Sequence, residues 1–396
     1  MGSMIELGLG HLEIDWGKNE FFRNHSKLFL ETDIAPATYY YAKGHTETKP
    51  AYVRKLGSVI KRLDLLGYTV EGCGCHYQNC IESTPEYYPT PETSFEIFKK
   101  ALASVEVNQV AVPGEDAGDF DLGEYASRAI LNNPEFAKTG IQLQSLSLDE
   151  GAFFENLDPY VTLRLLGENP KNLNEDLIWR FSDVVEGGWV EESELFEGLA
   201  SVDRYLIVTE GSSDSSILQH SLQLLEPDVV DFFSFVDMSH NYPFTGTGNL
   251  VNFCKGLSTI GIQNKILVIV DNDTAGRDAF QRIMALPLPS NMRAAVLPRL
   301  SEFTSFRTMG PTGEALEDVN GRAVAIECFL DLHFGREEPP AIRWTSYDPA
   351  AGQYQGELIQ KKDYTLAFFE HCGKDASYDL SKLKLLWSYL LKSCVA

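Results

Sequence analysis

Two short apolar runs in the second half of the chain, each ending in carboxylates, limit the fold more than any other feature. The first is Tyr205-Leu-Ile-Val, which leads to Glu210, and the second is Lys265-Ile-Leu-Val-Ile-Val, which leads to Asp271. A nearly unbroken apolar run of this length is typical of a strand that is covered on both faces in a parallel sheet. A segment with helical spacing follows each run. The sequence therefore predicts an α/β fold whose sheet is mostly parallel.

Acidic residues gather where these two predicted strands end. Glu210 and Asp214 follow the first strand, and Asp271 and Asp273 follow the second. Open α/β sheets bind ligands at the carboxyl ends of their strands, so neighbouring strands would bring all four acids to one edge. Carboxylates at such distances raise one another's pKa and oppose folding, and a hard divalent cation relieves this repulsion. We therefore expect one or two Mg2+ or Mn2+ ions bound by these residues.

The order of these residues resembles a known family. A strand ending in Glu210-Gly-x-x-Asp214, then a strand ending in Asp271-x-Asp273-x-Ala-Gly-x-x-Ala, is similar to the Toprim domain of primases, topoisomerases and OLD-family nucleases. The second motif resembles the primase form, and the first resembles the nuclease form. The resemblance implies a Rossmann-like, mostly parallel sheet flanked by helices over residues 202–335. It also implies catalytic roles for Glu210, Asp271 and Asp273.

Residues further along the chain complete the candidate site. OLD-type nucleases have an additional glutamate that completes a second metal position, and Glu327 is the candidate for it. Lys362 is the candidate for a catalytic cation that stabilises charge in the transition state. The candidates for contacts with nucleic acid are Arg277, Arg322 and Lys361. For each basic residue the alternative is an ordinary surface charge or ion pair.

Residues 336–396 are interpreted as a C-terminal extension that packs on the Toprim domain. The extension contains Trp344, Tyr347 and Tyr354. Aromatic side chains stack on bases in proteins that bind single-stranded nucleic acid. The alternative is that these residues belong to a cap that packs against the sheet.

The N-terminal half contains motifs of a different kind. They are Gly10-His-Leu-Glu-Ile-Asp-Trp-Gly-Lys-Asn19, Phe22-Arg-Asn-His-Ser26, and the segments 158–170 and 184–190. These motifs resemble the HEPN/Toprim-associated N-terminal domain, a module that precedes an RNase-type HEPN domain or a Toprim domain in bacterial proteins, often in anti-phage loci. Met1-Gly-Ser is typical of a cloning remnant, so we place this mixed α+β domain at residues 4–200.

His11, Asp15 and His25 lie within these motifs and invite a catalytic interpretation. No nucleophile and no metal-ligand spacing accompany them, and His and Asp are common in buried hydrogen-bonded networks. We therefore interpret these three residues as structural.

Apolar spacing elsewhere predicts local structure. A hairpin is expected over Glu6–Lys18, helices over Val53–Leu66, Ser94–Val105, Glu124–Leu131 and Glu175–Val185, and a loop over Phe303–Asn320.

The cysteines suggest a second, different metal site. Seven cysteines in a chain without a secretory signal indicate reduced thiols. Cys73, Cys75, His76 and Cys80 lie within eight residues and offer four ligands for zinc. Their spacing does not match a common zinc knuckle or ribbon. The alternative is a turn whose thiols are buried in the core.

The net charge of −24 is unusual for a protein that binds nucleic acid. Either the total hides a local basic groove, or binding depends on metal ions or on a more basic partner. No Gly-x4-Gly-Lys-Ser/Thr loop is present, so an ATPase would be a separate subunit. No apolar run is long enough to span a bilayer, and no secretory signal precedes the chain, so we expect a cytoplasmic protein without a membrane partner.

The favoured hypothesis is a divalent-metal-dependent nuclease that cleaves DNA or RNA, including tRNA, as the effector of an anti-phage system. Its expected partners are nucleic acid, a separate ATPase or sensor subunit, and a second copy of the chain. Topoisomerases need a separate tyrosine domain, and primases need a zinc ribbon and a polymerase subdomain, and none of these is recognisable here. The alternative is a degenerate Toprim module that binds metal or nucleic acid without hydrolysis and acts through a partner protein.

Overall fold

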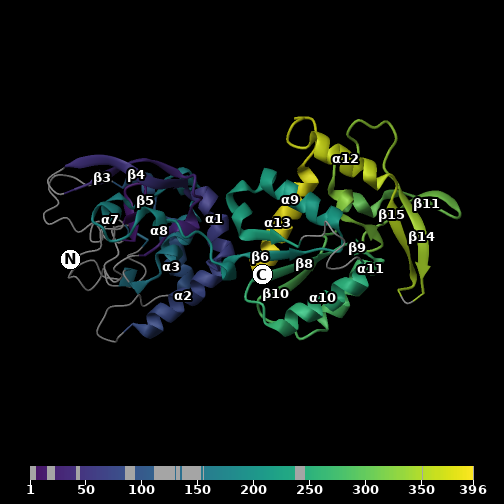
Figure 1. Cartoon of the computed structure of the whole chain (residues 1–396), viewed down its shortest axis with the longest axis horizontal. Helices are drawn as coiled ribbons and strands as arrows, with labels where there is room; N and C mark the ends of the chain where they lie inside the picture. The colour runs from purple at the N-terminus through teal and green to yellow at the C-terminus, as the bar shows by residue number, and fades with distance from the viewer. Residues whose placement is uncertain are drawn as a thin grey trace. The chain divides into compact units, whose positions relative to one another are not determined.

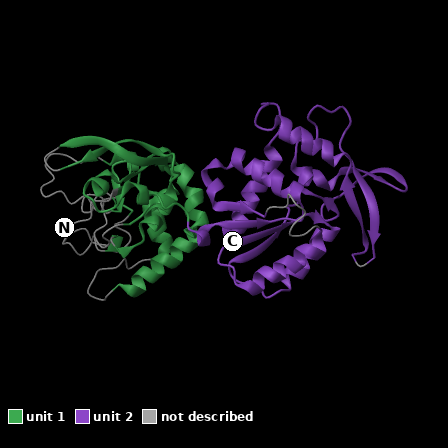
Figure 2. Ribbon diagram, viewed as in Figure 1, with its two compact units in different colours: residues 1–199 green, residues 200–396 purple. Residues whose placement is uncertain are grey.

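The computed structural model of the chain divides into two compact units, Met1–Leu199 and Ala200–Ala396 (Figure 2). We call them the N-terminal and the C-terminal unit. No helix in the described ranges has the length and apolar character that crossing a membrane requires. The structure describes residues 6–15, 23–41, 45–84, 94–110, 130, 134–135, 153–154, 156–236, 246–349 and 351–395.

The N-terminal unit is built on an antiparallel five-stranded sheet in the order β2-β1-β5-β4-β3. The predicted hairpin is confirmed as β1 and β2, which are joined through Gly10 at a φ of +56°, a backbone conformation that favours glycine. The strands are β1 (Glu6–Leu9), β2 (Leu12–Asp15), β3 (Ile34–Tyr40), β4 (Thr46–Lys55) and β5 (Asp176–Arg180).

Helices pack on this sheet and enclose a core centred on Trp179 of β5. The indole is fully buried and stacks on the ring of Tyr52 at 5.6 Å between centroids. The α-helices are α1 (Leu56–Leu65), α2 (Val70–Ser83), α3 (Phe95–Ala103), α6 (Pro159–Leu166), α7 (Ser182–Glu186) and α8 (Glu192–Leu195). Short 3-10 helices are η1 (Ser26–Leu28), η3 (Val107–Gln109) and η6 (Pro170–Asn174).

The prediction of a helix over Glu175–Val185 is wrong. Leu177 and Trp179 alternate onto the buried face of β5, which lies between β1 and β4, and only α7 that follows is helical. Short apolar alternation beside a helical turn imitates helical spacing, and pairing with two neighbouring strands decides against it. The helix predicted over Val53–Leu66 is α1, which begins at Leu56, because Val53 belongs to β4. The predicted helix Glu124–Leu131 lies, except for Ile130, outside the described residues.

The C-terminal unit contains a parallel four-stranded sheet in the order β10-β8-β6-β7. The two apolar runs are confirmed as adjacent parallel strands, with Tyr205 opposite Lys265 and Val208 opposite Val268. The chain goes from β6 to β7 on one side and later to β8 and β10 on the other. The point between β6 and β8 is therefore a topological switch point. The strands are β6 (Tyr205–Val208), β7 (Phe233–Phe235), β8 (Lys265–Val270) and β10 (Met292–Val296).

Helices cover both faces of this sheet, with α9 and α13 on one side and α10 and α11 on the other (Figure 1). The Trp387 indole N–H of α13 donates to the Ser221 hydroxyl of α9 at 2.9 Å, which joins the two helices on the first face. The α-helices are α9 (Ser212–Leu225), α10 (Thr247–Ile260), α11 (Thr274–Met284), α12 (Lys361–His371) and α13 (Ser381–Val395). The 3-10 helices are η7 (Ser201–Asp203), η8 (Pro227–Phe232), η9 (Ser301–Thr304) and η10 (Ile326–Phe329).

A second four-stranded sheet, in the order β12-β11-β14-β15, lies beside the helical layers. It corrects the predicted loop over Phe303–Asn320, which contains the hairpin β11–β12. A two-stranded ladder pairs β9, which follows β8, with β13, which follows β12, and the Arg322 carbonyl beside β13 accepts a hydrogen bond from Gly356 N–H of β15. The strands are β9 (Asn272–Asp273), β11 (Phe306–Gly310), β12 (Gly313–Glu317), β13 (Ala323–Val324), β14 (Ile342–Asp348) and β15 (Gln353–Leu358).

Replacing Trp179 by alanine is expected to destabilise the N-terminal unit strongly. The change removes a fully buried indole and leaves a cavity, at a cost of about 3–5 kcal/mol in the free energy of unfolding. Urea unfolding followed by far-ultraviolet circular dichroism measures the loss. Trp189→Ala is the matched control, because that indole is 52% exposed. Equal losses for the two variants would contradict this account of the core.

Candidate functional site

The two strand ends at the switch point are joined through their acids. Glu210 follows β6, and its Oε1 accepts a hydrogen bond from the backbone N–H of Asp271, the first residue after β8, at 3.1 Å. The two strands are neighbours in register, so their ends reach the same edge of the sheet. The predicted convergence of Glu210 and Asp271 is present in the fold.

Asp214 lies in the first turn of α9 and is 9% exposed. Its Oδ2 accepts a hydrogen bond from the Gly211 backbone N–H at 3.0 Å, and its Oδ1 accepts one from the Ser213 hydroxyl at 3.2 Å. The positive end of the helix dipole favours a carboxylate at this position.

Asp273 is held at both of its oxygens. It caps α11 by accepting a hydrogen bond from the Gly276 N–H at 2.7 Å, and the Gln355 side-chain amide donates to its other oxygen. The Gln355 carbonyl oxygen also accepts from the Thr274 N–H at 2.9 Å. Gln355 of β15 therefore fixes both Asp273 and the start of α11. No sequence pattern predicted this role, because Gln355 lies in a different sheet and is 82 residues from Asp273.

Gly276 is required by the close passage of α11 over the end of β8. A Cβ at this position would collide with the Asp271 carbonyl oxygen and lie 3.0 Å from the Asp271 carbonyl carbon. The glycine of the second acidic motif thus allows the helix to approach the backbone that carries Asp271.

Glu327 is completely buried in η10, and Lys361 is its charged neighbour. The Lys361 Nζ lies 3.1 Å from Glu327 Oε1 and forms an ion pair with it. Lys361 is the first residue of α12, and the preceding Gln360 has a φ of +59°. A left-handed non-glycine residue costs on the order of 1–3 kcal/mol, and such strain is common at functional sites. This left-handed residue lies directly before Lys361, where α12 begins.

The pKa values show how strongly the acids interact. Burial first, and the charges of Asp273 and Asp214 next, raise the pKa of Glu210 to about 7. Burial and the charge of Glu327 raise the pKa of Asp214 to about 6. Burial, followed by the charges of the other four acids, raises the pKa of Asp271 well above its ordinary value. Burial also raises the pKa of Asp273.

We call the carboxylates of Glu210, Asp214, Asp271, Asp273 and Glu327 the acidic cluster. Lys361 is the positively charged residue in contact with it. Burial acts to lower its pKa, but the charges of Glu327, Asp271 and Asp214 outweigh burial and raise it. One ammonium group does not neutralise five carboxylates, so the site favours a further cation, either a proton or a metal ion.

The fit to a divalent ion rests on the donor chemistry. Carboxylate oxygens are the ligands that Mg2+ and Mn2+ prefer, and the buried Glu327 carboxylate faces the Lys361 ammonium at 3.1 Å. Within the described ranges, no three His, Cys, Asp or Glu side chains are arranged to hold an ion by themselves. Mg2+ typically takes one or two carboxylates and completes its shell with water and substrate phosphate. The cluster fits an ion bound in that open manner.

The other predicted basic residues lie in different surroundings. Lys362 is exposed, and of the two lysines it is Lys361 that contacts the acids. Arg277 is exposed on α11 and passes closely over Gly321. The Arg322 guanidinium lies 4.1 Å above the Trp344 ring and 3.7 Å from Glu317.

The cysteines of the second predicted metal site lie on different faces of α2. Cys73 and Cys80 are buried, Cys75 is exposed, and the His76 ring stacks on Tyr68 at 4.8 Å. Burial raises the pKa of the Cys73 thiol to about 12, which keeps it protonated near neutral pH.

Asp15 and His25 of the N-terminal unit belong to a buried polar network. His25 Nε2 lies 3.2 Å from Asp15 Oδ2, and His25 Nδ1 lies 3.0 Å from the Tyr160 hydroxyl. Burial lowers the pKa of His25, so the imidazole is neutral near neutral pH. Arg23 binds both oxygens of Asp158 at 3.1 Å and extends the network. His11 lies outside it, 3.4 Å from the Tyr40 hydroxyl.

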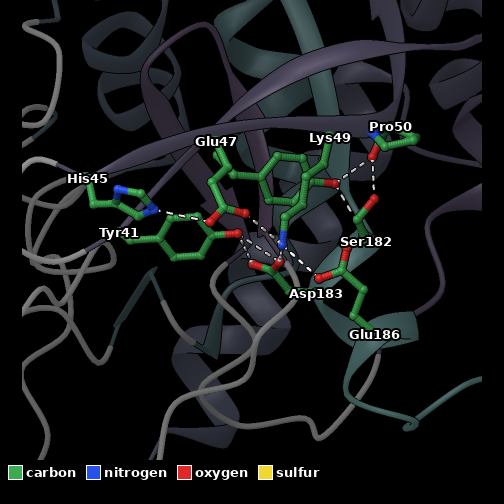
Figure 3. Close-up of polar contacts among 9 residues, drawn as sticks. Tyr41, His45, Glu47, Lys49, Pro50, Ser182, Asp183 and Glu186 are labelled. Carbon is green, nitrogen blue, oxygen red and sulfur yellow. Dashed lines mark hydrogen bonds and ion pairs between the residues drawn. The ribbon is translucent and has the colours of Figure 1, made fainter.

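A second polar cluster in this unit was not predicted. The Lys49 ammonium of β4 lies 2.8 Å from Asp183, 2.7 Å from Glu186 and 3.2 Å from Glu47, and the Tyr41 hydroxyl donates to Asp183 at 2.8 Å (Figure 3). These contacts fasten the β3–β4 hairpin to α7. Lys49 and Asp183 are 134 residues apart in the sequence, so no local pattern could reveal this contact.

The fold and the site define an α/β chain with a cluster of acids at the switch point of a parallel sheet. Over residues 1–203, the chain matches the family described as HEPN/Toprim N-terminal domain 1, and it belongs to that family. This match confirms the resemblance that the N-terminal motifs indicated. No curated protein and no solved structure matches the chain.

Gly276→Ala is expected to lower the free energy of unfolding of the C-terminal unit by about 1–3 kcal/mol, because the added methyl group collides with the Asp271 backbone. Thermal unfolding measures the change. Gly256→Ala in α10 is the control, since its Cβ would meet nothing within 4 Å and should stabilise the helix by up to about 1 kcal/mol. A neutral Gly276→Ala variant would show that the close approach is not required.

The stability of the metal-free protein is expected to depend on pH through the acidic cluster. The pKa of Glu210 is raised from 4.5 to about 7, and that of Asp214 from 3.8 to about 6, so protons bind the folded state more tightly. Their stabilising contribution is complete below about pH 4 and is lost as the pH rises through 6 to 7. Thermal unfolding in EDTA from pH 4 to pH 8 measures this loss.

Glu210→Gln is expected to flatten that dependence and to be more stable than the wild type at pH 8 in EDTA. Mg2+ should raise the melting temperature of the wild type more at pH 8 than at pH 5, because protons compete with the ion. A pH profile that is the same in both proteins would contradict the assignment of these pKa shifts.

Proposed function

We propose that the chain is a nuclease that uses Mg2+ or Mn2+ to hydrolyse phosphodiester bonds of DNA or RNA. The observation that carries the proposal is a cluster of five buried or half-buried carboxylates with one lysine at the switch point of a parallel sheet. Keeping such a cluster costs stability, and perturbed acids at a ligand-binding edge are typical of functional sites. The acidic motifs resemble those of Toprim nucleases, and the family name of the N-terminal domain refers to the same class.

In this proposal the acids would bind the metal ions and Lys361 would stabilise charge on the phosphate. Glu210, Asp214, Asp271, Asp273 and Glu327 would hold one or two ions. A bound ion would supply an activated water and would neutralise charge on the phosphate. Glu210, whose pKa is raised to about 7, can accept a proton near neutral pH. Lys361 would stabilise the negative charge that develops on the phosphate oxygens, the role that the sequence suggested for Lys362.

Gln355 and Gly276 are positioning residues in this proposal. Gln355 holds the Asp273 carboxylate in place, and Gly276 admits α11 to the Asp271 backbone. Such fixed orientation lowers the cost of binding the metal and substrate in a reactive geometry. The anti-phage role is part of the same proposal and rests on the loci in which this N-terminal domain occurs.

A second candidate function is a module that binds metal or nucleic acid without hydrolysis and acts through a partner. The net charge of −24 favours it, since a repulsive field weakens binding of a polyanion. The five acids favour the nuclease, because a site without catalysis has no need of so many costly charges.

The nuclease is tested by incubating the purified full chain with plasmid DNA, single-stranded DNA and total RNA. Cleavage is expected with Mg2+ or Mn2+, none with EDTA, and none for Asp271→Asn, which removes a charged ligand but keeps the shape. Lys361→Ala should lower turnover by about 100-fold to 1000-fold, which is the usual loss for one stabilising donor.

Lys362→Ala is the matched comparison, and it should lose less activity than Lys361→Ala. The reverse order would return the catalytic role to Lys362. Cleavage by Asp271→Asn at the wild-type rate would exclude this site as the active site. Mg2+ binding by calorimetry without turnover on any substrate would favour the second function. Plating of phages on cells that express wild type or Asp271→Asn tests the anti-phage role.

A further inference from the structure

A row of flat side chains runs over β14 and β15 in the C-terminal unit. The Arg322 guanidinium lies 4.1 Å above the Trp344 ring, and the centroids of Trp344 and Tyr354 are 6.4 Å apart. Tyr354 and Tyr347 follow at 5.1 Å. Tyr347 is 54% exposed and Tyr354 is 40% exposed, so the far end of the row is open to solvent. We call these four residues the aromatic row.

The β-sheet register places the aromatic row on one face. Tyr347 lies directly opposite Tyr354, and Trp344 lies opposite Gly356. Residues 344 and 347 of a regular strand would point to opposite faces, but the register shifts between Trp344 and Ser346 and brings both onto the same one. Gly356 leaves room for the Trp344 ring, because a Cβ there would lie 2.8 Å from it.

The aromatic row begins next to the acidic cluster. The backbone of Arg322 forms a bridge with that of Asp273. From there the row follows β14 and β15, which project with β11 from the layered part of the unit (Figure 1). The Arg322 end of the row is therefore the end closer to Asp273.

The charge of the chain limits which ligand this surface suits. A protein with a net charge of −24 gains little from long-range attraction to phosphates. Stacking on aromatic rings contributes affinity that does not depend on base sequence or on charge, and it needs unpaired bases whose faces are open. In a duplex those faces are covered by the neighbouring base pairs.

We propose that the aromatic row binds single-stranded nucleic acid, with bases stacked on the exposed Tyr347 and Tyr354 and the strand leading past Trp344 and Arg322 toward the acidic cluster. The proposal rests on the proposed nuclease function, to which it adds the class of substrate. Arg322 closes the stack at the acidic end, where its guanidinium lies flat on Trp344.

Binding is measured on the full chain carrying Asp271→Asn, which prevents cleavage. The probes are 12-nucleotide DNA and RNA strands that contain 2-aminopurine, whose fluorescence is quenched on stacking. Tyr347→Ala with Tyr354→Ala should weaken single-strand binding at least about tenfold and remove the quenching. Tyr347→Phe with Tyr354→Phe is the conservative control and should keep both. The matching duplex should bind more weakly than the single strand.

The outcomes separate this proposal from the nuclease proposal. Cleavage of duplex and single strands at equal rates, unchanged by the double alanine variant, would overturn the aromatic row and leave the nuclease intact. Tyrosine-dependent binding of single strands without cleavage by the wild type would retain the row and reject the nuclease. If sedimentation shows that the alanine variant loses only self-association, the row is an interface between copies and the proposal fails. Circular dichroism checks that both double variants are folded.

Discussion

Repulsion among the acids at the edge of the parallel sheet is the constraint on which the rest of the C-terminal unit depends. Burial raises the pKa values of Glu210, Asp214 and Asp271 far enough for protons to compete for them. The fold offsets this cost with groups from many elements. The Gly211 N–H before α9 donates to Asp214, the Gly276 N–H of α11 donates to Asp273, and Lys361 contributes a full positive charge.

The second sheet and α12 are part of the site for the same reason. Gln355 comes from β15 and Lys361 from α12, and both lie beyond residue 335, where the sequence placed the end of the catalytic domain. The core sheet carries the acids, and the C-terminal segment supplies the side chains that orient and neutralise them. The contacts around these acids therefore include residues from both sides of residue 335.

The N-terminal unit is organised by buried polar contacts of another kind. His25 is neutral and held between Asp15 and Tyr160, while Arg23 and Asp158 form a paired charge. The Lys49 ammonium contacts three carboxylates and thereby connects the β3–β4 hairpin to α7. Each of these groups is satisfied by a partner, whereas the acidic cluster of the C-terminal unit is short of positive charge. This difference separates a structural network from a site that can bind a cation.

The sequence alone determined the strand ends, because an apolar run and the carboxylate that ends it are local, and parallel strands end at a common edge. The convergence of Glu210 and Asp271 follows from that rule. Tertiary structure decided the rest. The left-handed Gln360 lies directly before α12, and in that helix Lys361 contacts Glu327, because one residue of a helix turns the side chain by about 100° relative to its neighbour. Pairing with β1 and β4 made a strand of residues that had helical spacing, and a shift of register brought Trp344 and Tyr347 onto one face. Contacts between distant segments produce each of these outcomes, and no local pattern contains them.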